Sequence, residues 1–337
     1  MENLSSILPD GRIQCLVCPH KCVIQKGKTG ICGVRKNAGD RIDLITYGVI
    51  SGMALDPVEK KPLYHFYPGS RIFSIGSWGC NMKCDFCQNF HISQNVELQP
   101  SRIVKPQEII DKALEAKDNI GIAFTYNEPV IWFEYIRDVA IPARESGLRT
   151  AMVTNGFMNE GILLEYLRFI DAFNVDLKSF NNNFYSRISG AELEPVKRSL
   201  KIIARAGRHL EITTLIIPGL NDSISEMESQ VRWISDELGK DVPLHLSRYF
   251  PMFKRTTPAT LQDELRKFSE IAQKHLHYVY MGNVTSDQGQ DTLCPGCGVI
   301  ITRRSGYHVE HLNTGNGRCN DCNTEIYRHF TSSSSWK

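Results

Sequence analysis

The chain has 337 residues, of which 42% are hydrophobic and 23% charged, and a formal net charge of +2. This composition supports a folded core and argues against a disordered protein, and the near-neutral charge argues against nucleic acid as a partner. No uncharged apolar run approaches the ~18 residues that a membrane span needs, and residues 1–14 show no signal-peptide pattern. We therefore expect a cytoplasmic protein without a membrane-spanning segment.

Short β-rich runs alternate with amphipathic helical patterns between about residue 70 and residue 285. The predicted strands are 71–77, 120–125, 149–154, 172–177, 210–217, 244–249 and 278–283. The predicted helices are 106–116, 130–145, 162–169, 193–206, 224–238 and 259–275. Alternation of this kind predicts parallel strands joined by right-handed crossovers. Six or seven such units fit a full or partial (β/α) barrel better than a doubly wound sheet.

The composition changes outside this region, and three domains are expected. They are a cysteine-rich N-terminal metal module over 1–44, the barrel over 45–285, and a zinc-ribbon-like module with a tail over 286–337. The N-terminal segment lacks the apolar periodicity of a self-supporting core, so a bound metal would have to stabilise it.

Eleven cysteines fall into a quartet, a triplet and a second quartet. They are Cys15, Cys18, Cys22 and Cys32; Cys80, Cys84 and Cys87; and Cys294, Cys297, Cys319 and Cys322. A cytosolic compartment disfavours disulfides, and such spacings are typical of metal ligands. The sequence therefore predicts three metal sites.

The central triplet, C-x-x-x-C-x-x-C, directly follows the first predicted strand. Three thiolates with no fourth cysteine nearby fit a 4Fe–4S cluster, which normally takes four ligands, with one iron left open. A site that lacks one protein ligand keeps room for an exogenous one. The alternatives are buried structural cysteines, or a zinc site that takes His91 as its fourth ligand.

With Phe86 directly before Cys87, this motif resembles the C-x-x-x-C-x-aromatic-C hallmark of the radical S-adenosylmethionine (SAM) superfamily. The resemblance implies a partial (β/α)6 barrel and a 4Fe–4S cluster whose open iron is chelated by SAM. It also implies reductive cleavage of SAM to a 5′-deoxyadenosyl radical, which abstracts hydrogen from a protein or small-molecule substrate. An electron donor such as flavodoxin or ferredoxin would be a partner. The rival hypotheses are a non-catalytic zinc-binding scaffold or interaction protein, and a ferredoxin-like carrier.

Polar residues at predicted strand ends support the resemblance, because barrel chemistry collects at the carboxyl ends of strands. Thr125-Tyr-Asn-Glu-Pro129 matches the closing Glu-Pro of the superfamily's Gly-Gly-Glu-Pro motif, with Tyr126 and Asn127 where two glycines usually stand. The resemblance places Glu128 on the SAM ammonium, with Asn127 beside it. A helix-capping carboxylate before Pro129 is the structural alternative.

Asp176-Leu-Lys178 resembles the Asp-x-Lys element of glycyl-radical-enzyme activating enzymes. The resemblance implies that Asp176 binds the ribose hydroxyls of SAM and that Lys178 binds its carboxylate. Asn155 comes from a matching Asp-Thr-Asn-Gly element in which Val153 replaces the aspartate, and it is a weaker candidate. His245 matches a histidine near the SAM site, although a lone histidine on an apolar strand is more often a core residue.

The segment 55–66, together with the N-terminal cysteines and 125–129, resembles the AmmeMemoRadiSam-system radical SAM enzymes. This resemblance covers nearly the whole chain and implies AMMECR-type and Memo-type proteins as candidate partners. A more distant resemblance is to activating enzymes of the pyruvate formate-lyase type.

The two quartets are expected to be closed structural sites. In the C-terminal quartet, two C-x-x-C pairs stand 21 residues apart, which predicts zinc first and a rubredoxin-like iron second. The N-terminal quartet is compatible with zinc or with a second 4Fe–4S cluster that relays electrons. Its spacing alone does not decide, and zinc is slightly favoured.

Overall fold

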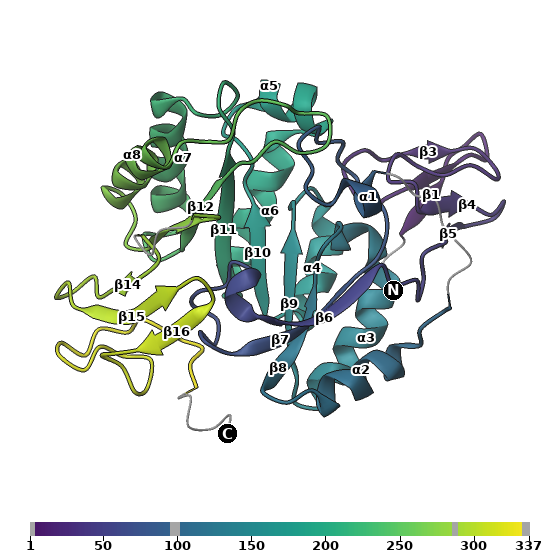
Figure 1. Ribbon diagram of the computed structural model, residues 1–337. Helices are drawn as coiled ribbons and strands as arrows, with labels where there is room; N and C mark the ends of the chain where they lie inside the picture. The colour runs from purple at the N-terminus through teal and green to yellow at the C-terminus, as the bar shows by residue number, and fades with distance from the viewer. Residues whose placement is uncertain (1–3, 95–101, 285–288, 332–337) are drawn as a thin grey trace.

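Eight strands form the central sheet in this computed structural model, which describes residues 4–94, 102–284 and 289–331 (Figure 1). The strands lie in the order β13-β12-β11-β10-β9-β8-β7-β6. Their bounds are β6 Gly52–Pro57, β7 Arg71–Gly76, β8 Asn119–Phe124, β9 Arg149–Thr154, β10 Ala172–Asp176, β11 His209–Ile216, β12 Leu244–Arg248 and β13 Val279–Gly282. Strands β7 to β13 are parallel to one another, and β6 runs antiparallel to β7.

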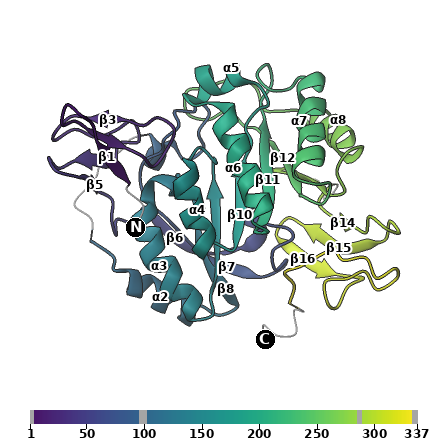
Figure 2. The same ribbon diagram turned by 180° about the vertical axis from the view of Figure 1, so that it is seen from behind.

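Helices join the parallel strands and cover one face of the sheet, as Figure 2 shows. The connecting helices are α2 Pro106–Glu115, α3 Phe133–Glu145, α4 Glu160–Phe169, α6 Leu193–Arg205, α7 Ile224–Glu237 and α8 Gln262–Gln273. Shorter elements are α1 Phe90–Ser93, α5 Asn182–Phe184, the 3-10 helices Val58–Lys60 and Pro129–Trp132, and the π-helical turn Tyr185–Ser189. Each connecting helix buries one apolar stripe, as Leu200 and Ile203 do on α6, which is the usual way to cover a parallel sheet.

This architecture confirms the predicted fold class. Strands and helices alternate from β7 onward, and each predicted strand ends within one residue of an observed strand end. In the described residues β6 and β13 do not pair with each other, so the barrel is partial. The carboxyl ends of the parallel strands therefore form one rim, where ligands bind in such folds.

Residues 58–70, between β6 and β7, lie across the amino ends of the barrel strands and are called the closing segment. Glu211 on β11 is buried and accepts the backbone N–H groups of Tyr64 at 3.0 Å and His65 at 2.7 Å. Asn174 on β10 donates to the carbonyl of Pro62 at 2.8 Å. These contacts cover the interior of the barrel at the amino ends of β10 and β11.

The N-terminal region forms two small antiparallel sheets. They consist of β1 Ser5–Ile7, β2 Ile13–Cys15 and β3 Val23–Ile24, and of β4 Arg35–Asn37 and β5 Ile42–Leu44. The buried Arg35 guanidinium makes two hydrogen bonds to Glu134 on α3, at 2.7 and 2.6 Å. A planar guanidinium suits this bidentate contact, which ties the region to the barrel.

The C-terminal region forms a three-stranded sheet of β14 Thr292–Leu293, β15 Ile300–Ser305 and β16 His308–His311. It lies near the amino ends of the barrel strands (Figure 1). Arg304 is buried, donates to the Tyr64 carbonyl at 2.9 Å and lies over the Tyr64 ring at 4.3 Å. This region therefore holds the closing segment in place. Within the described ranges, every helix is too short or too polar to span a lipid bilayer.

Candidate active site

The cysteine triplet lies in the loop that follows β7, on the rim of the barrel. Cys84 is buried, whereas Cys80 and Cys87 are partly exposed. Met82 donates its backbone N–H to Cys80 Sγ at 3.3 Å. Desolvation, and next the Glu128 carboxylate, raise the pKa of the Cys80 thiol well above its ordinary value. The thiolate therefore needs a bound cationic partner to form at neutral pH.

The three sulfurs of this loop do not form a compact single-ion site. Among the described residues, the C-terminal quartet is the one group of ligand atoms that all lie within 4.8 Å of one another. Thiolates about 2.3 Å from one tetrahedral zinc would lie about 3.8 Å apart. In an iron–sulfur cluster the cysteines bind different iron atoms, which needs a wider arrangement. The donor set of three soft thiolates therefore fits a 4Fe–4S cluster.

The turn after β8 clamps the chain just before the triplet. Asn127 accepts the Ser77 N–H at 2.9 Å and donates from Nδ2 to the Gly79 carbonyl at 3.1 Å. Tyr126, which stands at a glycine position of the resembled motif, has a φ of +71°, a conformation that favours glycine. Its hydroxyl donates to Asp56 Oδ2 at 2.7 Å, and this bond helps to hold the turn.

Glu128 is buried where β8 and β9 end. Its Oε1 accepts the Val130 N–H at 3.0 Å and the Thr154 hydroxyl at 2.6 Å, and Oε2 accepts the Asn155 N–H at 2.8 Å. Burial raises the pKa of Glu128 to about 7, although these three donors act in the opposite direction. A carboxylate offers about four acceptor positions, so there is capacity left for a cationic ligand.

Asn155 links this carboxylate to the cysteine loop. Its Nδ2 donates to Asn81 Oδ1 at 2.8 Å and lies 3.8 Å from Cys80 Sγ. Asn81 in turn donates to the Phe157 carbonyl at 2.7 Å. The ends of β7 and β9 are thus joined through two asparagine side chains.

Asp176 and Lys178 follow β10 and form an ion pair at 2.9 Å. The Lys178 ammonium lies 6.0 Å from the centre of the buried Phe86 ring. Burial lowers the pKa of Lys178, but the charge of Asp176 and then that of Cys84 outweigh it, and the net pKa is raised. Lys178 is therefore cationic and placed beside the cysteine loop.

His245 on β12 is buried. It shares a cross-strand row with Asp176 through Thr213, but its Nε2 lies 2.7 Å from Glu211 Oε2. Its ring packs edge-on against Tyr64 at 4.7 Å. The structure thus joins His245 to the closing segment, and its contact with SAM stays a prediction.

One contact of the cysteine loop has no signal in the sequence. Arg255, in the long loop after β12, binds both carboxylate oxygens of Asp85 at 3.1 and 2.5 Å. Phe253 of the same loop stacks on Phe90 at 4.6 Å. These pairs join segments about 170 residues apart, which a local motif cannot reveal, and they place the 249–261 loop beside the triplet.

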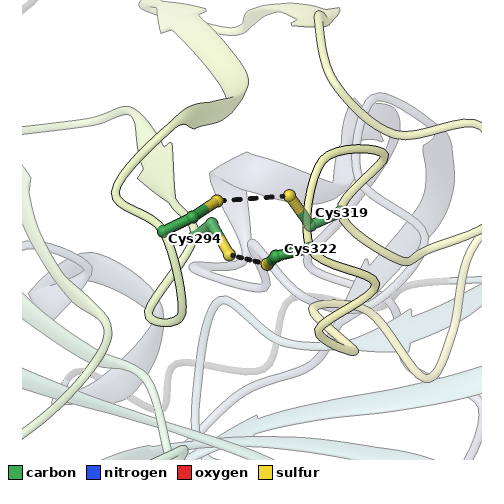
Figure 3. A group of neighbouring side chains, drawn as sticks. Cys294, Cys319 and Cys322 are labelled. Carbon is green, nitrogen blue, oxygen red and sulfur yellow. Dashed lines mark hydrogen bonds between the residues drawn. The ribbon is translucent and has the colours of Figure 1, made fainter.

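The C-terminal quartet is a compact group of four sulfurs, three of which are labelled in Figure 3. Cys294 Sγ lies 3.4 Å from Cys322 Sγ, and Cys297 Sγ lies 3.6 Å from Cys319 Sγ. These distances approach the ~3.8 Å that a tetrahedral thiolate site requires. The structure therefore brings the four cysteines of the predicted quartet close enough together to hold one metal ion.

Comparison with known proteins identifies the class. Residues 75–231 match the family model of the radical SAM superfamily. Over 95% of its length the chain is 36% identical to the uncharacterized protein MJ0808 of Methanocaldococcus jannaschii, and the match covers 96% of that protein. The chain belongs to the radical SAM superfamily, as the triplet with Phe86 indicates.

Activating enzymes are more distant relatives. The benzylsuccinate synthase activating enzyme of Thauera aromatica is 24% identical over 38% of this chain and 39% of its own length. The pyruvate formate-lyase-activating enzyme of Clostridium pasteurianum is 25% identical over 43% of this chain and 61% of its own. The matches span less than two thirds of either enzyme. They confirm the predicted distant resemblance.

Solved structures support the fold. A radical SAM methyltransferase from Sphaerobacter thermophilus has a TM-score of 0.52 and 17% identity, and the alignment covers 67% of this chain and 71% of that one. Streptococcus suis SuiB bound to S-adenosylmethionine has a TM-score of 0.50 and 14% identity, and here the coverage is 67% and 54%.

Proposed function

We propose that the protein cleaves SAM reductively and uses the 5′-deoxyadenosyl radical to abstract a hydrogen atom from a protein or small-molecule substrate. The 4Fe–4S cluster, when bound, supplies the electron for this cleavage and an open iron for SAM. The observation that carries the proposal is the meeting of Cys80, Glu128, Asn155 and Lys178 on one rim of a radical SAM barrel.

Different rim residues bind different groups of SAM and of the cluster. Cys80, Cys84 and Cys87 bind the cluster. Glu128 accepts the SAM ammonium, because its buried carboxylate gains most from a cationic partner. Asp176 accepts the ribose hydroxyls, and Lys178 leaves Asp176 to bind the SAM carboxylate.

Further residues position these groups. Asn127 fixes the chain before Cys80, and Asn155 fixes both Glu128 and the cysteine loop. Phe86 gives Lys178 an apolar surface. The 249–261 loop, held by Arg255 on Asp85, limits access of water to the rim.

The relatives suggest only the general class of substrate and partner. Activating enzymes suggest a protein substrate and a one-electron donor such as flavodoxin or ferredoxin. AMMECR-type and Memo-type proteins are the partners that the sequence resemblance proposes. The C-terminal quartet binds zinc and stabilises the module that holds the closing segment.

Product analysis tests the proposed function. The reconstituted protein is incubated anaerobically with SAM and dithionite, and 5′-deoxyadenosine and methionine are quantified. We expect both products in equal amounts, and none from the Cys84→Ala variant. An intact cluster with no 5′-deoxyadenosine would overturn the proposal. Near-zero iron with zinc in all three cysteine groups would favour the scaffold hypothesis.

A further inference from the structure

The N-terminal quartet is a second group of thiols that the proposed chemistry does not use. Its cysteines line one small cavity, together with His20 and Arg35. Cys15, Cys18 and Cys32 are buried, and Cys22 is partly exposed. Four thiols thus surround one cavity.

The spacing of these sulfurs distinguishes between the two alternatives that the sequence leaves open, zinc and a second 4Fe–4S cluster. Within the described residues, no three of these four sulfurs all lie within 4.8 Å of one another. The four sulfurs of the C-terminal quartet do. A tetrahedral zinc site requires about 3.8 Å between all its sulfurs. The four sulfurs are thus not gathered as one tetrahedral zinc requires, whereas a cluster takes one thiolate on each of its four irons and needs its cysteines farther apart.

A buried positive charge faces the same cavity. Arg35 is 1% exposed and lines the cavity, and its charge acts on Cys15 and Cys32. Glu134 holds the guanidinium from the other side, at 2.7 and 2.6 Å. A fixed cation beside four thiolates offsets part of their negative charge.

The quartet also contacts the loop of Cys80 on both sides of that residue. His20, two residues after Cys18, bonds through Nε2 to the Asn81 carbonyl at 2.8 Å. The Cys32 carbonyl packs so closely on Gly79 that a Cβ there would lie 2.6 Å from it. The residues before and after Cys80 therefore both touch the cavity-forming segment.

We propose that Cys15, Cys18, Cys22 and Cys32 bind a second 4Fe–4S cluster, which delivers electrons to the cluster of the triplet. A reduced flavodoxin or ferredoxin loses one electron to the N-terminal cluster, which then returns to its oxidised state by passing that electron on. The relay rests on the proposed function, whereas the cluster itself does not. This assignment differs from the zinc that the sequence slightly favours.

Metal analysis without the triplet tests the cluster. In a Cys80→Ala/Cys84→Ala/Cys87→Ala variant, reconstituted anaerobically, we expect roughly four iron and four sulfide per chain to remain. The N-terminal site is unchanged in this variant, so folding of that module is not disturbed directly. Retained zinc with no iron would overturn the assignment, whatever the intact protein does with SAM.

Matched variants and spectroscopy complete the test. Cys22→Ser in the triple variant should abolish the remaining iron–sulfur absorption, and the exposed Ser186→Ala should not. After dithionite reduction, the intact protein should show an electron paramagnetic resonance signal broadened by two interacting clusters. The triple variant should show one isolated signal. Two non-interacting signals in the intact protein would overturn the relay.

Discussion

The carboxylate of Glu128 accepts the backbone N–H of Asn155 at 2.8 Å and so joins the ends of β8 and β9. Asn155 reaches from there to the cysteine loop, 3.8 Å from Cys80 Sγ. Asn155 would therefore connect a cationic ligand on Glu128 to a cluster on Cys80. The buried carboxylate thus links the ammonium-binding position to the cysteine loop.

Replacing Glu128 with glutamine should weaken SAM binding by about 10- to 150-fold, because a hydrogen bond to a charged group contributes about 1.5–3 kcal/mol. The amide keeps the shape but loses the charge that the ammonium requires. Equilibrium dialysis of cluster-loaded protein with labelled SAM measures the change. The exposed Glu194→Gln on α6 is the control. Unchanged affinity at equal iron content would contradict the assigned role.

Asn127→Ala should lower the free energy of unfolding by about 1–3 kcal/mol, because it leaves the Ser77 N–H and the Gly79 carbonyl without their partner. The same change should reduce iron retained after gel filtration, since the loop before Cys80 loses its clamp. Thermal unfolding and iron analysis measure the two effects. The exposed Asn183→Ala should alter neither. A stable variant that also retains full iron would show that the clamp is dispensable.

The sequence allowed the parallel strands to be predicted because their buried runs are continuous and bounded by turn residues. It did not reveal β6, whose Gly52 and Pro57 ends are typical of turns. The triplet and Glu128 were predictable from local spacing. The contact of Arg255 with Asp85 was not, since it depends on how two distant loops meet. The side-chain contact between His245 and Glu211 also depends on strand register, which a single sequence does not specify.

Arg255→Ala should speed loss of the cluster in air about threefold to tenfold, because a partly buried ion pair contributes on the order of 1 kcal/mol. The variant loses the two bonds to Asp85 that hold the 249–261 loop beside the triplet. Bleaching of the iron–sulfur absorption after exposure to air measures the rate. Lys254→Ala, an exposed neighbour, should bleach at the parent rate. Equal rates for all three proteins would exclude a shielding role for this loop.

Stability should fall as the pH rises through 7, in part because of Glu59. Burial raises the pKa of Glu59 to about 7, although Arg304, 4.0 Å away, lowers it. The folded-state pKa of this carboxyl lies above its ordinary value of 4.5. Its contribution to the free energy of unfolding is therefore fully present below pH 4.5 and is lost as the pH rises through 7. Glu59→Gln should therefore reduce the loss between pH 5.5 and 8.5 by on the order of 2 kcal/mol. Urea unfolding at both pH values measures it, and an unaltered pH slope would contradict it.

Loss of metal from the C-terminal quartet should destabilise the closed end of the barrel before it affects the rim. Cys319→Ser removes one ligand from a compact four-sulfur site, and the module then holds Arg304 and the Tyr64 carbonyl less firmly. We expect faster amide exchange in residues 58–66, and loss of roughly one zinc per chain. Iron content and SAM affinity should stay near parental values, because the triplet lies at the opposite end of the strands.

Hydrogen exchange read by mass spectrometry, with metal analysis on the same samples, distinguishes this result from global unfolding. Equal exchange in 58–66 after zinc loss would show that the module does not support the closing segment.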